Sequence, residues 1–232
     1  METGAARAWD AVDASASSRA EVLAELNGRI RSMQKATLGA GAEAPVVPVV
    51  SELRDLFPGG GLRPGGVYEV LSPLLATMLL AEATRAGDWV AVVGMPDFSA
   101  AAAASAGVDI ARVVVVPHPG GQGIRVSATL ADVMSIVVLG EAADVGAGEA
   151  QRLEARLRRT GSVLLRLGEW AGAEDRLAVA ERQWSGIRAG HGHLAACQVT
   201  ATARGRAAAP RRVTFVLSEM SDARDGLEHS NE

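Results

Sequence analysis

The chain has a single cysteine, Cys197, and a single lysine, Lys35, among its 232 residues. One cysteine excludes an intrachain disulfide and any zinc site built from several cysteines. Aromatic residues make up only 3% of the sequence, so we expect an aliphatic core of valine, leucine, isoleucine and alanine. No apolar run reaches the ~20 residues that a membrane-spanning helix needs, and the first residues lack the pattern of a secretory signal. We therefore expect a cytoplasmic protein without a membrane anchor.

The remaining composition is that of a folded domain. Apolar residues make up 48% of the chain, and 232 residues suffice for one medium α/β domain with appendages. The formal net charge is −4, whereas a dedicated nucleic-acid binder usually carries a strongly basic face. The composition disfavours such a binder and leaves room for a local basic patch.

The pattern along the chain divides it into five parts. Residues 1–17 read as a flexible N-terminus, 39–48 as a linker, 49–218 as the core and 219–232 as a disordered tail. Residues 18–38 read as an amphipathic helix that starts in a capping box at Ser18 and Glu21. Its apolar face consists of Val22, Leu23, Leu26, Ile30 and Met33. This face packs on the chain's own core, on a neighbouring copy or on a different protein.

Short apolar runs separated by helical or alanine-rich segments indicate strands that are buried on both faces of a parallel sheet. The expected strands are 67–71, 89–93, 113–116, 136–139 and 163–167. The expected helices are 51–57, 74–86, 99–106, 127–132 and 148–160. Apolar and polar residues then alternate over 197–203 and 212–217, which predicts an antiparallel hairpin around a loop at 204–211. A further strand at 183–187 leads into it.

The segment GGGLRPGGVYEVLSPLLATMLLAEA, residues 59–83, has the approach to a phosphate-binding loop without the loop itself. Such a loop needs consecutive backbone N–H groups, a helix N-terminus and a lysine. After the expected strand at 67–71, Ser72 and Pro73 run straight into a helical pattern, and proline removes one donor. We expect this position to be a degenerate phosphate site that binds no nucleotide.

The strand that carries the magnesium-binding aspartate in such ATPases also has a counterpart here. The run DVMSIVVLGE, residues 132–141, matches it in register and hydrophobicity. Leu139 or Gly140 stands where the acid belongs, so we expect the acid to be lost. Glu141 is the one neighbouring carboxylate that offers a substitute.

Other candidate sites are clusters of one residue type. Arg152, Arg156 and Arg159 share one face of the expected helix at 148–160, which reads as a solvated face. Four arginines crowd the hairpin loop and offer contacts to DNA or to an acidic partner, or serve as a solubilising loop tip: Arg204, Arg206, Arg211 and Arg212. His191 and His193 are too few for a metal site, and we expect no metal, no cofactor and no catalytic constellation.

Taken in order, the capped N-terminal helix, GGGLRPGGVYEV, DVMSIVVLG, SVLLRL and the terminal hairpin resemble the core of RecA over roughly residues 18–218. Among RecA-like proteins, the chain resembles the actinobacterial ImuA-type mutasome proteins. The resemblance implies an α/β, RecA-like fold: a mainly parallel central sheet flanked by helices, with a C-terminal antiparallel hairpin. It also implies a role in damage-induced mutagenesis beside ImuB, an inactive Y-family polymerase homologue, and an error-prone C-family polymerase.

The two loops through which RecA binds DNA correspond to residues 141–149 and 168–173. Both are short, and EAADVGAGE is acidic, whereas a loop that neutralises phosphates should be basic. We therefore expect weak or no direct DNA binding and a non-catalytic adaptor that associates with the nucleoid on damage. The alternatives are a degenerate DNA-binding recombinase paralogue or ATPase, and a cell-division inhibitor like SulA.

Overall fold

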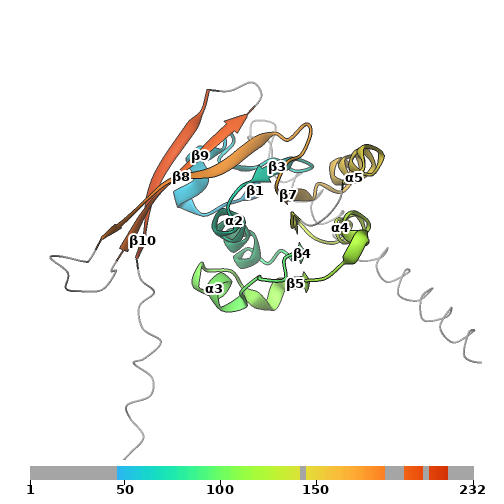
Figure 1. Cartoon of the computed structure of the whole chain (residues 1–232), viewed down its shortest axis with the longest axis horizontal. Helices are drawn as coiled ribbons and strands as arrows, with labels where there is room; N and C mark the ends of the chain where they lie inside the picture. The colour runs from blue at the N-terminus through green and yellow to red at the C-terminus, as the bar shows by residue number, and fades with distance from the viewer. Residues whose placement is uncertain (1–45, 142–144, 186–195, 206–208, 219–232) are drawn as a thin grey trace, which may run out of the picture.

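The computed structural model describes residues 46–141, 145–185, 196–205 and 209–218. These residues form an eight-stranded mixed sheet with helices on both faces, and a two-stranded sheet beside it (Figure 1). The order across the large sheet is β10-β9-β8-β3-β7-β6-β4-β5. The predicted N-terminal helix at 18–38, its apolar face from Val22 to Met33, and the predicted tail lie outside the described residues.

Six neighbouring strands of the large sheet run parallel. The first five are β3 (Val67–Val70), β4 (Val90–Val93), β5 (Val113–Val116), β6 (Ile136–Leu139) and β7 (Val163–Leu167). All four residues of β4 and of β6 are buried, as continuous apolar runs require in a sheet covered on both faces. The five strands expected from apolar runs are therefore present, and none is displaced by more than one residue at either end.

The sheet continues into an antiparallel extension. It consists of β8 (Asp175–Ser185), β9 (Ala196–Gly205) and β10 (Arg211–Ser218), with β8 pairing parallel to β3 and antiparallel to β9. The predicted hairpin is thus present. The predicted strand at 183–187 overlaps the end of a much longer strand, β8. The start of β8 was not predicted, because exposed charged residues and a register shift between Val179 and Glu181 break the alternation of apolar and polar residues.

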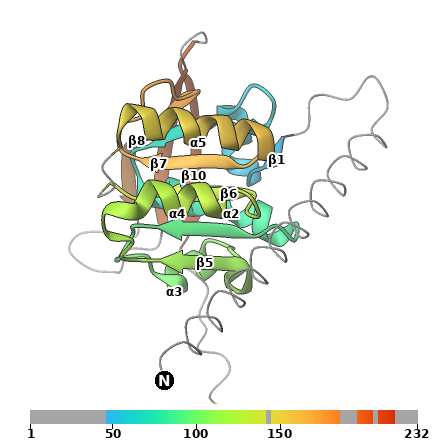
Figure 2. The ribbon, with the colours of Figure 1, turned by 90° about the vertical axis from the view of Figure 1, so that its right-hand side faces the viewer.

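Helical segments cover the two faces of the parallel part. On one face lie η1 (Ser51–Leu56), α2 (Pro73–Arg85) and α3 (Ala100–Ser105), and on the other α4 (Gly123–Leu130) and α5 (Ala147–Thr160). Figure 2 shows α4 and α5 side by side in front of the sheet. The segment expected as a helix at 51–57 is a 3-10 helix, and α4 starts four residues before the expected 127. The glycine-rich start of α4 reads as a loop in the sequence, yet Ile124 is buried against the sheet.

Short connecting elements complete the described chain. The strands β1 (Val47–Pro48) and β2 (Gly61–Leu62) pair antiparallel, so the last two residues of the expected linker at 39–48 belong to a strand. The single-turn 3-10 helices η2 (Ile110–Arg112) and η3 (Gly120–Gln122) lead into β5 and α4. Within the described residues, no helix is both long and apolar enough to cross a membrane.

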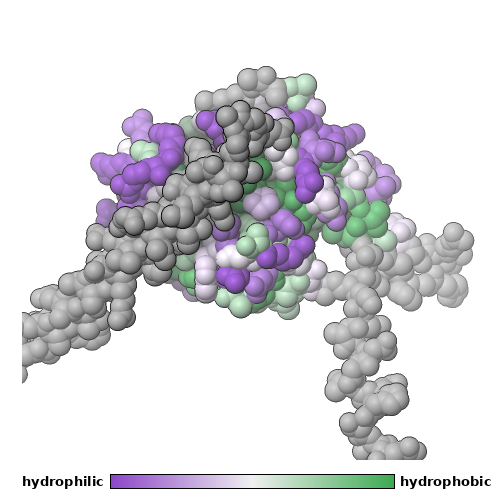
Figure 3. All heavy atoms as spheres, turned by 180° about the vertical axis from the view of Figure 1, so that it is seen from behind, coloured by the Kyte–Doolittle hydropathy of each residue, from purple (hydrophilic) through white to green (hydrophobic). Residues whose placement is uncertain are grey.

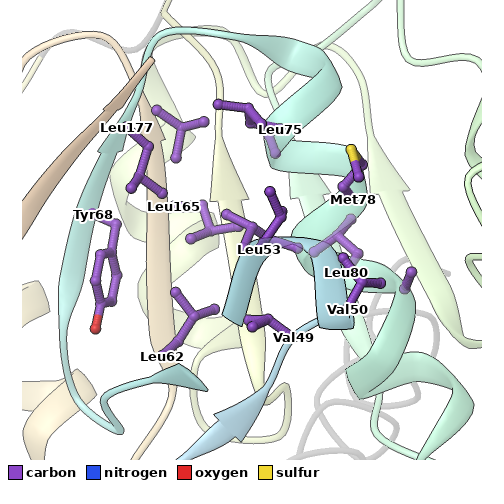
Figure 4. Packing of buried hydrophobic residues seen from close by; sticks show 14 of the residues in the cluster. Val49, Val50, Leu53, Leu62, Tyr68, Leu75, Met78, Leu80, Leu165 and Leu177 are labelled. Carbon is purple, nitrogen blue, oxygen red and sulfur yellow. The ribbon is translucent and has the colours of Figure 1, made fainter. Parts of the chain in front are cut away.

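Each face of the sheet has its own hydrophobic cluster. The larger one joins η1, α2 and the inner face of β8–β10, and Figure 4 shows its side chains converging between strand and helix. Phe57 meets Tyr68 edge-on there, with ring centroids 5.8 Å apart. The smaller cluster holds α4 and α5 against the parallel strands and includes no residue of β8, β9 or β10. The predicted α/β architecture, a mainly parallel sheet flanked by helices with an antiparallel C-terminal extension, is confirmed.

Candidate functional site

The carboxyl ends of the parallel strands form the edge at which open α/β sheets bind ligands. Here Val70, Val93, Leu139 and Leu167 are the last residues of β3, β4, β6 and β7. The residues that follow determine whether this edge can hold a phosphate group.

The connection from β3 to α2 consists only of Leu71 and Ser72. The Leu71 N–H donates to the Leu177 carbonyl oxygen at 2.8 Å, and Pro73 at the start of α2 has no N–H. Ser72 is buried, and its hydroxyl has no hydrogen-bond partner among the described residues. A connection of this length offers no run of free N–H groups that could surround a phosphate. That Ser72 and Pro73 mark a degenerate site that binds no nucleotide stays a prediction.

Gly140 occupies the position expected for the lost magnesium-binding acid, and the backbone of Gly94 closes that position. The Gly140 N–H donates to the Val93 carbonyl oxygen at 2.8 Å. A Cβ atom on Gly140 would lie 2.0 Å from the Gly94 oxygen and 2.7 Å from the Gly94 carbonyl carbon. Leu139, the other candidate, is fully buried in the smaller cluster. An aspartate side chain therefore has no space at residue 140.

Arg166 reinforces this closure from the neighbouring strand. It is 6% exposed on β7, and its guanidinium donates to the carbonyl oxygens of Gly140 and Glu141, the latter at 3.2 Å. Burial lowers the pKa of Arg166, and the Glu141 carboxylate opposes that shift. Glu141, the substitute acid considered from the sequence, thus interacts electrostatically with the Arg166 guanidinium of the same chain. The sequence signal for this contact is one arginine inside the apolar run SVLLRL.

The second loop expected to correspond to a DNA-binding loop, 168–173, folds back onto the protein. Trp170 is 4% exposed, and its backbone N–H donates to Glu69 Oε1 at 2.7 Å. Its indole N–H donates to Glu154 Oε1 at 2.9 Å. The loop expected at 141–149 lies partly outside the described residues. The described loop is thus held against β3 and α5 by a buried tryptophan.

Acidic neighbours neutralise most of the arginine face of α5. Arg156 donates to Asp132 Oδ1 at 2.6 Å, and this hydrogen bond raises the pKa of Arg156. Arg159 Nη2 lies 3.7 Å from Asp132 Oδ1, and the neighbouring Arg158 Nη1 lies 3.5 Å from Glu154 Oε2. Figure 3 shows hydrophilic side chains gathered over α5. The interpretation as a solvated helix face fits these contacts.

The hairpin arginines fall into different environments. Arg211 forms an ion pair with Asp175, and the two side chains are 18% and 9% exposed. Burial raises the pKa of Asp175, and Arg211 opposes that shift. Arg204 and Arg212 are exposed, and Arg206 lies outside the described residues. Arg211 thus joins β10 to β8 across β9 and is not a freely presented contact.

No group of three or more metal-ligating side chains occurs in the part of the chain that the structure describes. His191 and His193 fall outside that part, and Cys197 is buried on β9. A shallow pocket of about 290 Å³ lies beside β3 and β8. Its lining residues are Glu69, Trp170, Gly172, Ala173, Asp175, Arg176, Arg204 and Gly205.

Comparison with known proteins finds a matching family, a relative in sequence and a similar solved structure. The family described as MT3502 N-terminal domain matches residues 55–172, from within η1 to just before β8. The uncharacterized protein Rv3395c of Mycobacterium tuberculosis is 40% identical over 129 residues, which are 53% of this chain and 63% of that protein. The chain therefore spans less than two thirds of that relative's length.

Among solved structures, the flagellar accessory protein FlaH from Methanocaldococcus jannaschii superposes with a TM-score of 0.49 at 10% identity. The superposition covers 76% of this chain and 100% of FlaH. Because the family match spans half of the sequence and includes the whole closed edge of the parallel sheet, the chain belongs to the MT3502 N-terminal domain family.

Proposed function

We propose that this protein is a non-catalytic RecA-like adaptor in damage-induced mutagenesis. It docks an ImuB-like, inactive Y-family polymerase homologue and, through that protein, an error-prone C-family replicative polymerase. The identity of the partners rests on the sequence resemblance. In this proposal the protein acts in the cytoplasm, associates with the nucleoid after damage and binds DNA weakly or not at all.

The observation that carries the proposal is the closed carboxyl edge of the sheet. A nucleotide site of this kind needs a phosphate-binding loop after one strand and an acid after another. Leu71 and Ser72 replace the loop, and Gly140 packs on Gly94 where the acid belongs. In this proposal both changes remove the same chemistry, while the helices pack on both faces of the sheet. A fold kept without its reaction would act through its surfaces.

The alternatives make different demands on the same residues. A degenerate ATPase has to bind phosphates with other groups, and the described edge offers Arg166 only as a buried side chain bonded to two carbonyl oxygens. A DNA-binding recombinase paralogue would use the hairpin arginines, of which Arg211 is paired with Asp175. A SulA-like inhibitor would block assembly of FtsZ, which a polymerisation assay with purified FtsZ tests directly.

Co-purification tests the adaptor role. The tagged chain and an ImuB-like homologue from the same genome are co-expressed and then passed through size-exclusion chromatography. The proposal expects a complex that survives about 0.5 M salt, since surface charge pairs are screened at that ionic strength and an adaptor interface also needs apolar contacts. Elution of the two proteins as separate peaks under low salt would overturn it.

A further inference from the structure

The antiparallel extension has one sheet face that no described helix covers. Residues paired directly across an antiparallel ladder point to the same face. Arg176 on β8 pairs with Arg204 on β9, and Arg212 on β10 pairs with Thr202, two residues along β9 from Arg204. These three arginines therefore share a face, and none of them belongs to the cluster that holds α4 and α5.

This part of the chain differs in charge from the rest. Residues 182–218 contain six arginines and no aspartate or glutamate, in a chain whose formal net charge is −4. Like charges placed directly opposite on a sheet are destabilising, so a pair such as Arg176 and Arg204 needs a compensating group. Among the described residues no carboxylate forms an ion pair with Arg204.

Arg176 and Arg204 both line the pocket beside β3. Glu69 forms an ion pair with Arg176, with 3.4 Å between Arg176 Nε and Glu69 Oε2. Glu69 is fixed in turn, because its other oxygen accepts the Trp170 backbone N–H. Gly205, which also lines the pocket, packs closely on Asp175, because a Cβ atom there would lie 2.5 Å from Asp175 Oδ1. Arg176 is thus paired with a fixed carboxylate, while Arg204, its partner across the ladder, is exposed.

We propose that this pocket binds a carboxylate side chain from an acidic peptide segment of a partner protein. A carboxylate that accepts from the Arg176 and Arg204 guanidinium groups would form charge-assisted hydrogen bonds, the strong class of such bonds. The volume of about 290 Å³ suits one amino-acid side chain and falls below that of most small-molecule pockets. The formal net charge of −4 disfavours DNA as the occupant, because a nucleic-acid binder usually carries a strongly basic face.

The inference rests on the adaptor role and names the chemistry of one contact in it. Its first test uses the full chain and a fluorescein-labelled peptide of alternating glutamate and glycine, with a glutamine–glycine peptide as the neutral control. Fluorescence anisotropy at low salt should give binding of the glutamate peptide that weakens at least tenfold in Arg176→Gln and in Arg204→Gln. Equal binding by wild type and Arg204→Gln would overturn the proposal.

Arg182→Gln is the matched control, because Arg182 is an exposed arginine on the same strand β8 but pairs with Val199, whose side chain lies on the opposite face. We expect Arg182→Gln to bind the peptide within twofold of wild type. The melting temperature of Arg204→Gln should equal or exceed that of wild type, since the substitution removes a like-charge pair. If Arg182→Gln lost as much peptide binding as Arg204→Gln, the loss would follow from the change in net charge, and the proposal that this pocket binds the carboxylate would be refuted.

Two further arms separate the occupants. A single-stranded oligonucleotide that binds more tightly than the peptide, and loses binding in Arg204→Gln, would overturn the proposal in favour of nucleic acid. The chain's own segment 219–232 carries five acidic residues and one arginine. If the peptide binds only after those acids are changed to amides, the occupant is that segment and the assignment to a partner is wrong.

Co-purification with the ImuB-like homologue keeps the two proposals distinguishable. If wild type forms the complex and the Arg176→Gln, Arg204→Gln double variant does not, both stand. If wild type and the double variant form the complex equally, the pocket proposal fails and the adaptor role remains. If wild type forms no complex, the adaptor role fails.

Discussion

Replacing Gly140 by alanine tests directly whether the acid position is closed by packing. A Cβ atom at residue 140 would lie 2.0 Å from the Gly94 oxygen, against about 3.3 Å or more for an ordinary carbon–oxygen contact. The ends of β4 and β6 therefore have to move apart by more than 1 Å. That movement breaks the Gly140 N–H bond to Val93 and disturbs the bond from Arg166 to the Gly140 oxygen.

Two terms set the expected cost of Gly140→Ala. Overpacking costs about 1–3 kcal/mol, and the lost backbone hydrogen bond adds about 1 kcal/mol. The free energy of unfolding should therefore fall by about 3 kcal/mol, which lowers the melting temperature of a protein of this size by about 6–12 °C. Differential scanning calorimetry of the full chain measures both quantities.

Gly148→Ala is the matched control for this substitution. Gly148 lies in α5, and a Cβ atom there would meet nothing within 4 Å. Alanine favours a helix over glycine by up to about 1 kcal/mol, so the control should leave the melting temperature unchanged or raise it. If Gly140→Ala melts within about 2 °C of wild type, the contact with Gly94 does not close the site and the reasoning fails.

Three further predictions concern titration and pairing. Burial raises the pKa of Tyr68, the only tyrosine, to about 12, so absorbance at 295 nm should titrate near that pH; a midpoint near 10 would contradict its burial. Because this folded-state pKa exceeds the unfolded value, the stability contributed by Tyr68 is complete below about pH 10 and is lost as the pH rises toward 12. Arg211→Met should lower the free energy of unfolding by about 3 kcal/mol, because it leaves the buried Asp175 carboxylate without its partner. Arg212→Met, on the exposed face, is the control and should change the free energy of unfolding by less than about 0.5 kcal/mol. Equal effects of the two substitutions would refute the buried pair. Removing Arg211 also raises the pKa of Asp175 further, so the loss should be smaller at pH 5 than at pH 7 in thermal denaturation; a loss as large at pH 5 would contradict this coupling.

The sequence predicts the parallel part of the fold well because its signals are local. Val90–Val93 and Ile136–Leu139 are continuous apolar runs, and such runs suit strands buried on both faces. The start of β8 at Asp175 is not visible in the same way. Its outer residues are charged, and a register shift after Val179 breaks the alternation on which the prediction depends.

For the candidate site, the sequence could predict only that the phosphate-binding loop and the magnesium-binding acid are missing. Ser72-Pro73 shows directly that no phosphate-binding loop follows β3, because that loop is contiguous in sequence. The role of Gly140 depends on Gly94, 46 residues away, and the two meet only because β4 and β6 are neighbours in the sheet. The pairing of Arg211 with Asp175 likewise depends on the order of β8, β9 and β10, which no local pattern encodes.

Calorimetric titration of the full chain with Mg²⁺-ATP tests the central claim most directly. A closed carboxyl edge predicts no heat beyond dilution up to about 1 mM nucleotide, with no change in melting temperature. Saturable, magnesium-dependent binding with a Kd of about 10 μM or tighter would contradict the closed site and the non-catalytic role built on it.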